Sequence, residues 1–174
     1  MTLYSQNNSR VSQVTVTKAL AAAGNYAGAD VLSEDASSGT SWNFAKVVPS
    51  NGGSGRMVKA VALLETTALT PGITLFLFNA TPTCQLNDNA ANTAVLHADE
   101  AGFVGRITFP AMADLGTGDS EAIVTPSLTT GNLPLDFICA SGDQDLYGVV
   151  VTRDAVTGES AGDDLIIKLL IHQD

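Results

Sequence analysis

The feature of this sequence that most limits its fold is a succession of short apolar runs, each soon followed by glycine, proline, asparagine or aspartate. Runs of this length fit β-strands better than helices, which need a longer periodic apolar face. Alternation is clearest over residues 56–65, which predicts a strand with two distinct faces. One face would contain Val58, Ala60, Ala62 and Leu64. The other would contain Met57, Lys59, Val61, Leu63 and Glu65. Residues 103–109 alternate in the same way, which predicts a half-buried strand.

Two further runs, residues 73–78 and 146–151, are apolar almost throughout and predict central strands covered on both faces. The other strand candidates are residues 11–17, 29–32, 42–48, 121–125, 135–140 and 165–172. Loops and turns are expected at residues 49–55, 70–72, 141–145 and 157–164. The polar segment 81–92 lacks periodicity and is interpreted as a surface excursion. Only residues 17–23 have a helical pattern, with a strand or a loop as the alternative.

The length of 174 residues fits one domain, which needs neither a metal nor a disulfide to hold its core. We therefore predict a single-domain, all-β, antiparallel sandwich over residues 11–174, preceded by a short N-terminal arm at residues 1–10. Cys84 and Cys139 are far apart in sequence, and free thiols are favoured over a disulfide between them. The hydrophobic fraction of 45% is high for a chain with 15% charged residues, which favours partial coverage by a partner.

The net charge of −10 comes from 18 acidic and 8 basic residues, and the basic ones are scattered along the chain. Binding to nucleic acid depends on a basic stripe that displaces counterions from phosphates, and binding to anionic membranes depends on similar clusters. Both partners are therefore excluded. The start of the chain does not resemble a signal peptide, and no apolar run has the length of a membrane span. We expect a soluble protein made in a cytoplasm.

The residues that usually carry catalysis form no recognisable site. His97 and His172 are interpreted as surface histidines, and two histidines alone do not make a closed zinc site. Ser120 lies in a Gly-Asp-Ser-Glu-Ala segment that only loosely resembles a nucleophile elbow, because a strand and not a helix follows it. The glycine-rich residues 51–55 lack the lysine and the helix of a phosphate-binding loop. We predict no catalytic, cofactor-binding or metal-binding residues.

Acidic residues gather in pairs at the expected turns, where solvated charges that discourage aggregation are the simplest interpretation. A calcium ion bound by loop carboxylates stays open as an alternative. Among the aromatic residues, Trp42 alternates with Phe44 and is assigned to the core. Leu3 and Tyr4 lie instead in the polar N-terminal arm, where they have little local core to join and are candidates for docking on a neighbouring protein.

Three segments carry a resemblance to a known class of proteins: Tyr-Ala-Gly-Ala-Asp-Val at residues 26–31, Leu-Phe-Leu-Phe-Asn-Ala-Thr-Pro at 75–82, and Asp-Leu-Tyr-Gly-Val at 145–149. The chain resembles small structural proteins of tailed bacteriophages that are encoded near the major capsid protein, some of which are capsid decoration, or cement, proteins. The resemblance implies a jelly-roll-like sandwich, a homotrimer, and a place on the outer capsid surface between capsomers. It brings no catalytic or ligand residues with it.

The leading hypothesis is therefore a non-enzymatic virion protein that bridges subunits of the major capsid protein and associates with itself. Leu3, Tyr4 and Arg10 in the arm are the candidate capsid contacts. The alternative from another class is a carbohydrate-binding or host-recognition module on the virion, since jelly rolls are also lectin folds. A hydrolase that uses the loop carboxylates Asp143 and Asp145 is a third hypothesis.

Overall fold

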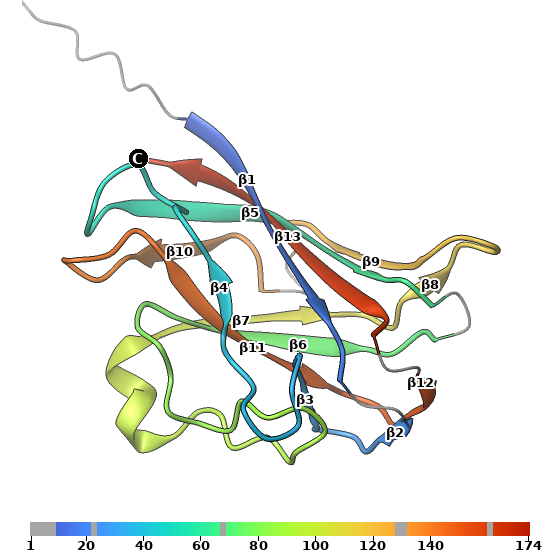
Figure 1. Cartoon of the computed structure of the whole chain (residues 1–174). Helices are drawn as coiled ribbons and strands as arrows, with labels where there is room; N and C mark the ends of the chain where they lie inside the picture. The colour runs from blue at the N-terminus through green and yellow to red at the C-terminus, as the bar shows by residue number, and fades with distance from the viewer. Residues whose placement is uncertain (1–9, 22–23, 67–68, 128–131, 160–161) are drawn as a thin grey trace, which may run out of the picture.

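The computed structural model describes residues 10–21, 24–66, 69–127, 132–159 and 162–174, which form two facing antiparallel sheets (Figure 1). The six-stranded sheet contains, in spatial order, β1 (Arg10–Ala19), β13 (Asp164–Gln173), β5 (Ser54–Leu64), β9 (Ser120–Val124) and β8 (Ala113–Asp114), with β10 (Leu135–Ile138) also paired to β5. The five-stranded sheet contains β3 (Val31–Leu32), β11 (Leu146–Thr152), β6 (Ile73–Phe78) and β7 (Phe103–Phe109), with β4 (Trp42–Phe44) also paired to β11. A small third sheet pairs β2 (Gly24–Tyr26) with β12 (Val156–Glu159).

The strand pairs are nested along the chain. β1 pairs with β13, β2 with β12, β3 and β4 with β11, β5 with β9, and β6 with β7. Each of these pairs lies inside the preceding one in sequence, so the chain is arranged as one long antiparallel hairpin folded into two layers. The predicted all-β antiparallel sandwich is confirmed.

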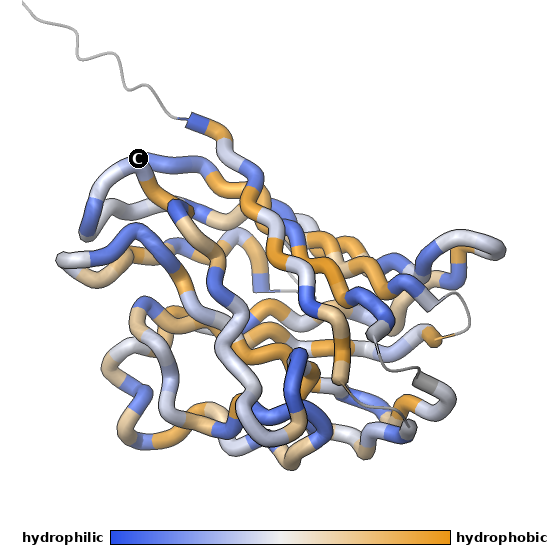
Figure 2. The backbone as a smooth tube through the Cα atoms, viewed as in Figure 1, coloured by the Kyte–Doolittle hydropathy of each residue, from blue (hydrophilic) through white to orange (hydrophobic). Residues whose placement is uncertain are grey.

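The main core lies between the two sheets and contains buried apolar side chains from both of them. Figure 2 shows the hydrophobic positions along the facing strands. Trp42 and Phe44 are fully buried in it, as predicted. The predicted faces of β5 are wrong in one respect, because the pairing with β13 shifts by one residue between Leu170 and Ile171. This bulge places Met57 in the core together with Ala60, and leaves Val58 only partly buried.

A second, smaller apolar cluster covers the outer face of the five-stranded sheet. It joins Phe78 of β6 and Val149 of β11 to Cys84 in the long segment between β6 and β7. The runs at residues 73–78 and 146–151 are therefore central strands with apolar cover on both faces, as predicted. The excursion at residues 81–92 has no regular strand or helix, and a short 3₁₀ helix, η1 (His97–Gly102), follows it.

The helical interpretation of residues 17–23 is wrong for residues 17–19, where the alternative of a strand is confirmed. Thr17, Lys18 and Ala19 belong to β1 and pair with β13, while residues 22 and 23 lie outside the described part of the chain. Pairing with β13 satisfies the backbone groups of this segment and places Leu20, just beyond the strand, in the main core. The connection predicted at residues 157–164 is also partly wrong, because its beginning forms β12.

Candidate docking groove along strand β7

The residues predicted as capsid contacts are only partly described. Arg10 is the first residue of β1 and is exposed, whereas Leu3 and Tyr4 lie outside the described residues. Their role as contacts stays a prediction. Trp42 and Tyr26 are buried in the core, which leaves neither ring free to stack on a sugar.

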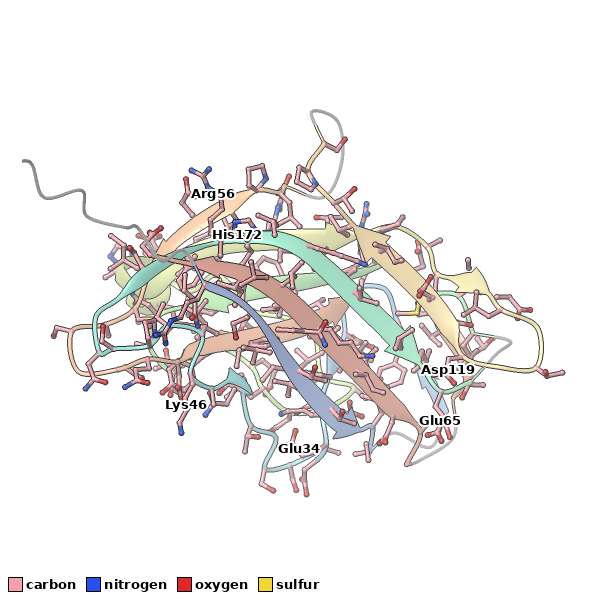
Figure 3. The ribbon with its side chains drawn as sticks, turned by 90° about the horizontal axis from the view of Figure 1, so that it is seen from above. Glu34, Lys46, Arg56, Glu65, Asp119 and His172 are labelled. Carbon is pink, nitrogen blue, oxygen red and sulfur yellow. The ribbon has the colours of Figure 1, made fainter. Side chains whose placement is uncertain are left out.

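The two histidines are on the surface and far from each other in the fold. His97 is 97% exposed and its Nδ1 lies 3.1 Å from a carboxylate oxygen of Glu100. His172 is exposed on the outer face of the six-stranded sheet, opposite Arg56 on the neighbouring strand (Figure 3). Ser120 is buried at the start of β9, and its hydroxyl donates to the carbonyl of Thr66. None of these three side chains faces a cleft with another, so they form no joint site.

Several of the acidic turn residues accept hydrogen bonds that hold loops in place. Asp99 accepts from the backbone N–H groups of Thr83 and Cys84, which fixes the excursion to η1. Asp143 accepts from the Tyr147 hydroxyl at 2.7 Å. This bond lowers the pKa of Asp143 and raises that of Tyr147 to about 12. Within the described ranges, no group of three or more histidine, cysteine or carboxylate side chains is placed to hold a metal ion.

The glycine-rich segment at residues 51–55 uses its backbone donors internally. The N–H of Gly52 donates to the carbonyl of Asp143, and the N–H of Gly53 donates to that of Ser50. These bonds tie the segment to the loop before β11 and give it a structural role in place of an anion cradle.

A partly buried ion pair, in which Lys18 is buried and Glu34 is one-third exposed, joins β1 to the loop after β3. The side chain of Lys18 is only 9% exposed. Its ammonium group bonds to Glu34 and Thr40 and lies 5.6 Å from the centre of the Trp42 ring. Burial lowers the pKa of Lys18. Burial also opposes ionisation of Glu34, but hydrogen bonds from Lys18, Ser33 and Thr40 outweigh it and lower the pKa of Glu34 to about 2. The pair closes one side of the sandwich between its two sheets.

We expect Glu34→Gln to lower the free energy of unfolding by about 2 kcal/mol at neutral pH, because the buried Lys18 then loses its ion-pair partner. Since the pKa of Glu34 falls from 4.5 to about 2 on folding, its stabilising effect is complete above pH 4.5 and disappears as the pH falls towards 2. In urea unfolding at neutral pH and at steps below pH 4.5, the free energies of unfolding of the wild type and Glu34→Gln should therefore become more similar as the pH falls. Glu100→Gln, at an exposed pair, is the control; an equal difference at every pH would contradict the assignment.

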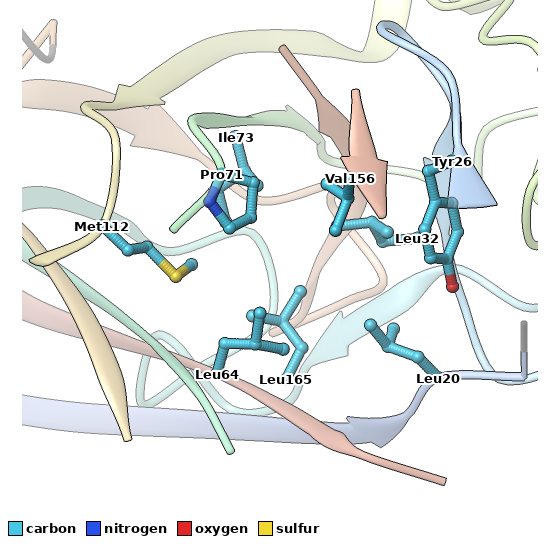
Figure 4. Close-up of a pocket in the computed structure, with 9 residues that line it drawn as sticks. All are labelled: Leu20, Tyr26, Leu32, Leu64, Pro71, Ile73, Met112, Val156 and Leu165. Atoms are coloured by element: carbon cyan, nitrogen blue, oxygen red, sulfur yellow. The ribbon is translucent and has the colours of Figure 1, made fainter. Parts of the chain in front are cut away.

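One enclosed cavity is a packing void in the main core. It has a volume of about 10 Å³ and is lined only by apolar side chains and the ring of Tyr26 (Figure 4). This is space for about one water molecule, with no polar partners to hold it, so it is not a ligand site. The thiols of Cys84 and Cys139 are free and buried, and burial raises both pKa values to about 11. Neither is a thiolate at neutral pH.

Three surface hollows adjoin one another where β7, at the edge of its sheet, faces β9 and β10 of the other sheet. We call this surface the β7 groove. At one end, a hollow of about 470 Å³ lies between Phe103 on β7 and Ile138 on β10. Ile138 is 65% exposed, the highest value among large apolar side chains in the described residues. A middle hollow, lined by Phe76, Val95 and Leu135, continues from Phe103.

The other end of the β7 groove is a hollow of about 740 Å³ lined by two arginines. Arg106 projects from β7, and Arg153 directly follows β11. Ile123, which is 43% exposed, lies with them. We call this the arginine end, and the part around Phe103 and Ile138 the apolar end.

The β7 groove differs in composition from the rest of the protein. Three of the eight basic residues line it, namely Arg56, Arg106 and Arg153. Only two of the eighteen acidic residues do so, Asp136 and Asp174. Arg56 and Asp136 are paired with each other. A groove that joins exposed apolar side chains to arginines, on a protein with an excess of acidic residues, is typical of a site for another protein.

Within the residues described, no helix has the length and apolarity that crossing a bilayer requires. No protein-family model matches the sequence, and a search among curated proteins finds no significant relative.

Proposed function

We propose that this protein is a non-enzymatic structural component of a bacteriophage virion, a decoration protein that binds the major capsid protein on the outside of the head. The sequence resemblance introduced the proposal, and the β7 groove is the observation that carries it. A decoration protein needs a rigid body and a surface that is covered only in the assembled shell. The apolar end of the groove has that character, because Phe103 and Ile138 are exposed beside a well-packed core.

The nested strand pairs support the jelly-roll part of the proposal. A jelly roll is a long antiparallel hairpin wound into two sheets, with its first strand paired to its last and its middle strands paired to each other. The pairs β1 with β13, β3 and β4 with β11, β5 with β9, and β6 with β7 follow this order. The strands β8 and β10 are then additions beside β9 and β5.

Assembly on a capsid does not require a strong contact at any single groove. Each contact needs only modest strength when a self-associated decoration protein engages several neighbouring capsid subunits at once, since the later contacts are intramolecular. The acidic charge over the rest of the surface limits aggregation between many copies on one particle.

The test is co-sedimentation with empty capsids assembled from the major capsid protein. We expect the wild-type protein to pellet with the capsids and Ile138→Asp to bind at least about tenfold more weakly, because a charge then enters the apolar end. Ala36→Asp is the control, since Ala36 is exposed in the loop after β3 and lies outside both the groove and the N-terminal arm. A wild-type protein that stays in the supernatant would remove the proposal, and equal weakening by both variants would move the contact away from the groove.

A further inference from the structure

We propose that the arginine end of the β7 groove receives the turn between β8 and β9 of a second copy of this chain, so that copies associate head to tail. This goes beyond the proposed function and does not depend on it. The occupant follows from two surfaces of the same molecule that match in charge and in apolar character.

The first surface is the arginine end itself. Within the described part of the chain, neither Arg106 nor Arg153 belongs to an ion pair, although the protein carries ten more acidic than basic residues. None of the described residues lining this hollow is acidic. Arginine binds carboxylates through two parallel N–H donors. Asn132, whose amide donates to the carbonyl of Arg106, and the exposed side chain of Ile123 also line the hollow. It is therefore suited to a segment that combines carboxylates with an apolar side chain.

The second surface is the turn between β8 and β9, residues 114–119, which extends beyond the rest of the six-stranded sheet (Figure 1). Leu115 is 53% exposed there, between Asp114 and Asp119. The N–H of Gly116 donates to the carboxylate of Asp114 at 2.7 Å at the start of this turn. No basic residue occurs in the sequence between Arg106 and Arg153, so nothing nearby in sequence neutralises the two aspartates.

The two surfaces complement each other. The carboxylates of Asp114 and Asp119 would meet the guanidinium groups of Arg106 and Arg153, and Leu115 would cover Ile123. Because the turn and the hollow are different surfaces, the first contact leaves the turn free on one molecule and the hollow free on the other. A contact of this kind closes into a ring or continues as a chain of molecules.

The test is analytical ultracentrifugation at about 0.15 M salt, where the net repulsion between acidic copies is largely screened. We expect the wild-type protein to form assemblies larger than a monomer at about 100 µM. A hollow-defective variant, Arg106→Glu with Arg153→Glu, should be monomeric. A turn-defective variant, Asp114→Asn with Leu115→Ser and Asp119→Asn, should also be monomeric. Arg10→Glu with Lys46→Glu changes the net charge by the same amount as the hollow-defective variant, at exposed residues outside the hollow, and should assemble like the wild type.

The decisive sample is a mixture of the two defective variants. It contains one intact hollow and one intact turn per pair of molecules, so we expect heterodimers and nothing larger. Circular dichroism and thermal unfolding establish that each variant is folded. A monomeric wild type, a hollow-defective variant that assembles normally, or a mixture that stays monomeric would overturn the proposal. Capsid co-sedimentation is read separately: a wild-type monomer that pellets with capsids removes this inference and leaves the proposed function standing.

Discussion

Replacing Phe78 by alanine is expected to lower the free energy of unfolding by about 4 kcal/mol, and the melting temperature by about 10 °C. The ring is fully buried, although it belongs to the cluster on the outer face of the five-stranded sheet and not to the core between the sheets. It packs beside Phe103, with the two ring centres 5.5 Å apart. Removing it leaves a cavity that the segment between β6 and β7 fills only in part. Guanidinium unfolding followed by fluorescence and by circular dichroism measures the change.

Leu115→Ala is the control for this experiment, since its side chain is more than half exposed and its loss should change stability by less than about 0.5 kcal/mol. If Phe78→Ala resembled that control, the outer face of β6 would be open to solvent. The segment between β6 and β7 would then be a loose loop and not a cover.

The strands could be predicted from the sequence because alternating and continuous apolar residues indicate which faces of a strand are buried. The pattern at residues 56–65 identified β5, and the continuous runs identified β6 and β11 as central. The error at Met57 has a definite cause: a β-bulge inserts one residue into the alternation, and nothing in the sequence marks where it occurs. The helical interpretation failed at residues 17–19 because alanine-rich sequence is compatible with several backbone states until pairing with β13 decides.

The second apolar cluster could not be predicted, because the segment that forms it is mostly polar and aperiodic. Its burial depends on Asp99 and Asp88, which accept backbone N–H groups inside the loop region and so replace the regular hydrogen bonds that a strand would supply. In sequence, both residues look like ordinary turn carboxylates. Their function as internal acceptors becomes apparent only when the backbone around them is known.

The β7 groove was missed for a different reason. Its exposed apolar residues, Phe103, Ile123 and Ile138, come from three strands that are far apart in sequence, and each looks like an ordinary strand residue. Arg106 and Arg153 are likewise isolated in sequence, so the sequence alone does not indicate that they form a cluster. Only the meeting of the two sheet edges brings them together. A weak signal was present in the high apolar content relative to charge, but it does not locate the surface.

The other large effect is expected at Asp88, a carboxylate that is only 2% exposed. It accepts hydrogen bonds from the hydroxyl of Tyr26 at 3.0 Å and from the N–H of Ser33 at 2.6 Å. Asp88→Ala takes this acceptor away from two buried donors and removes a negative charge that favours the charged form of Lys18. We expect the free energy of unfolding to fall by about 3 kcal/mol in urea unfolding.

Two further variants show whether this loss comes from the hydrogen bonds. Tyr26→Phe removes one donor and leaves the bond from Ser33 in place, so it should cost about 1 kcal/mol. Asp88→Asn keeps one accepting oxygen of similar size and should lie between the other two variants. This order separates the loss of acceptors from the loss of side-chain volume, because asparagine fills nearly the same space as aspartate. Asp88→Asn and Asp88→Ala could instead each lower the free energy of unfolding as little as Tyr26→Phe. Asp88 would then not be the residue that holds the segment between β6 and β7 to the loop after β3. Packing alone would have to stabilise the two apolar clusters.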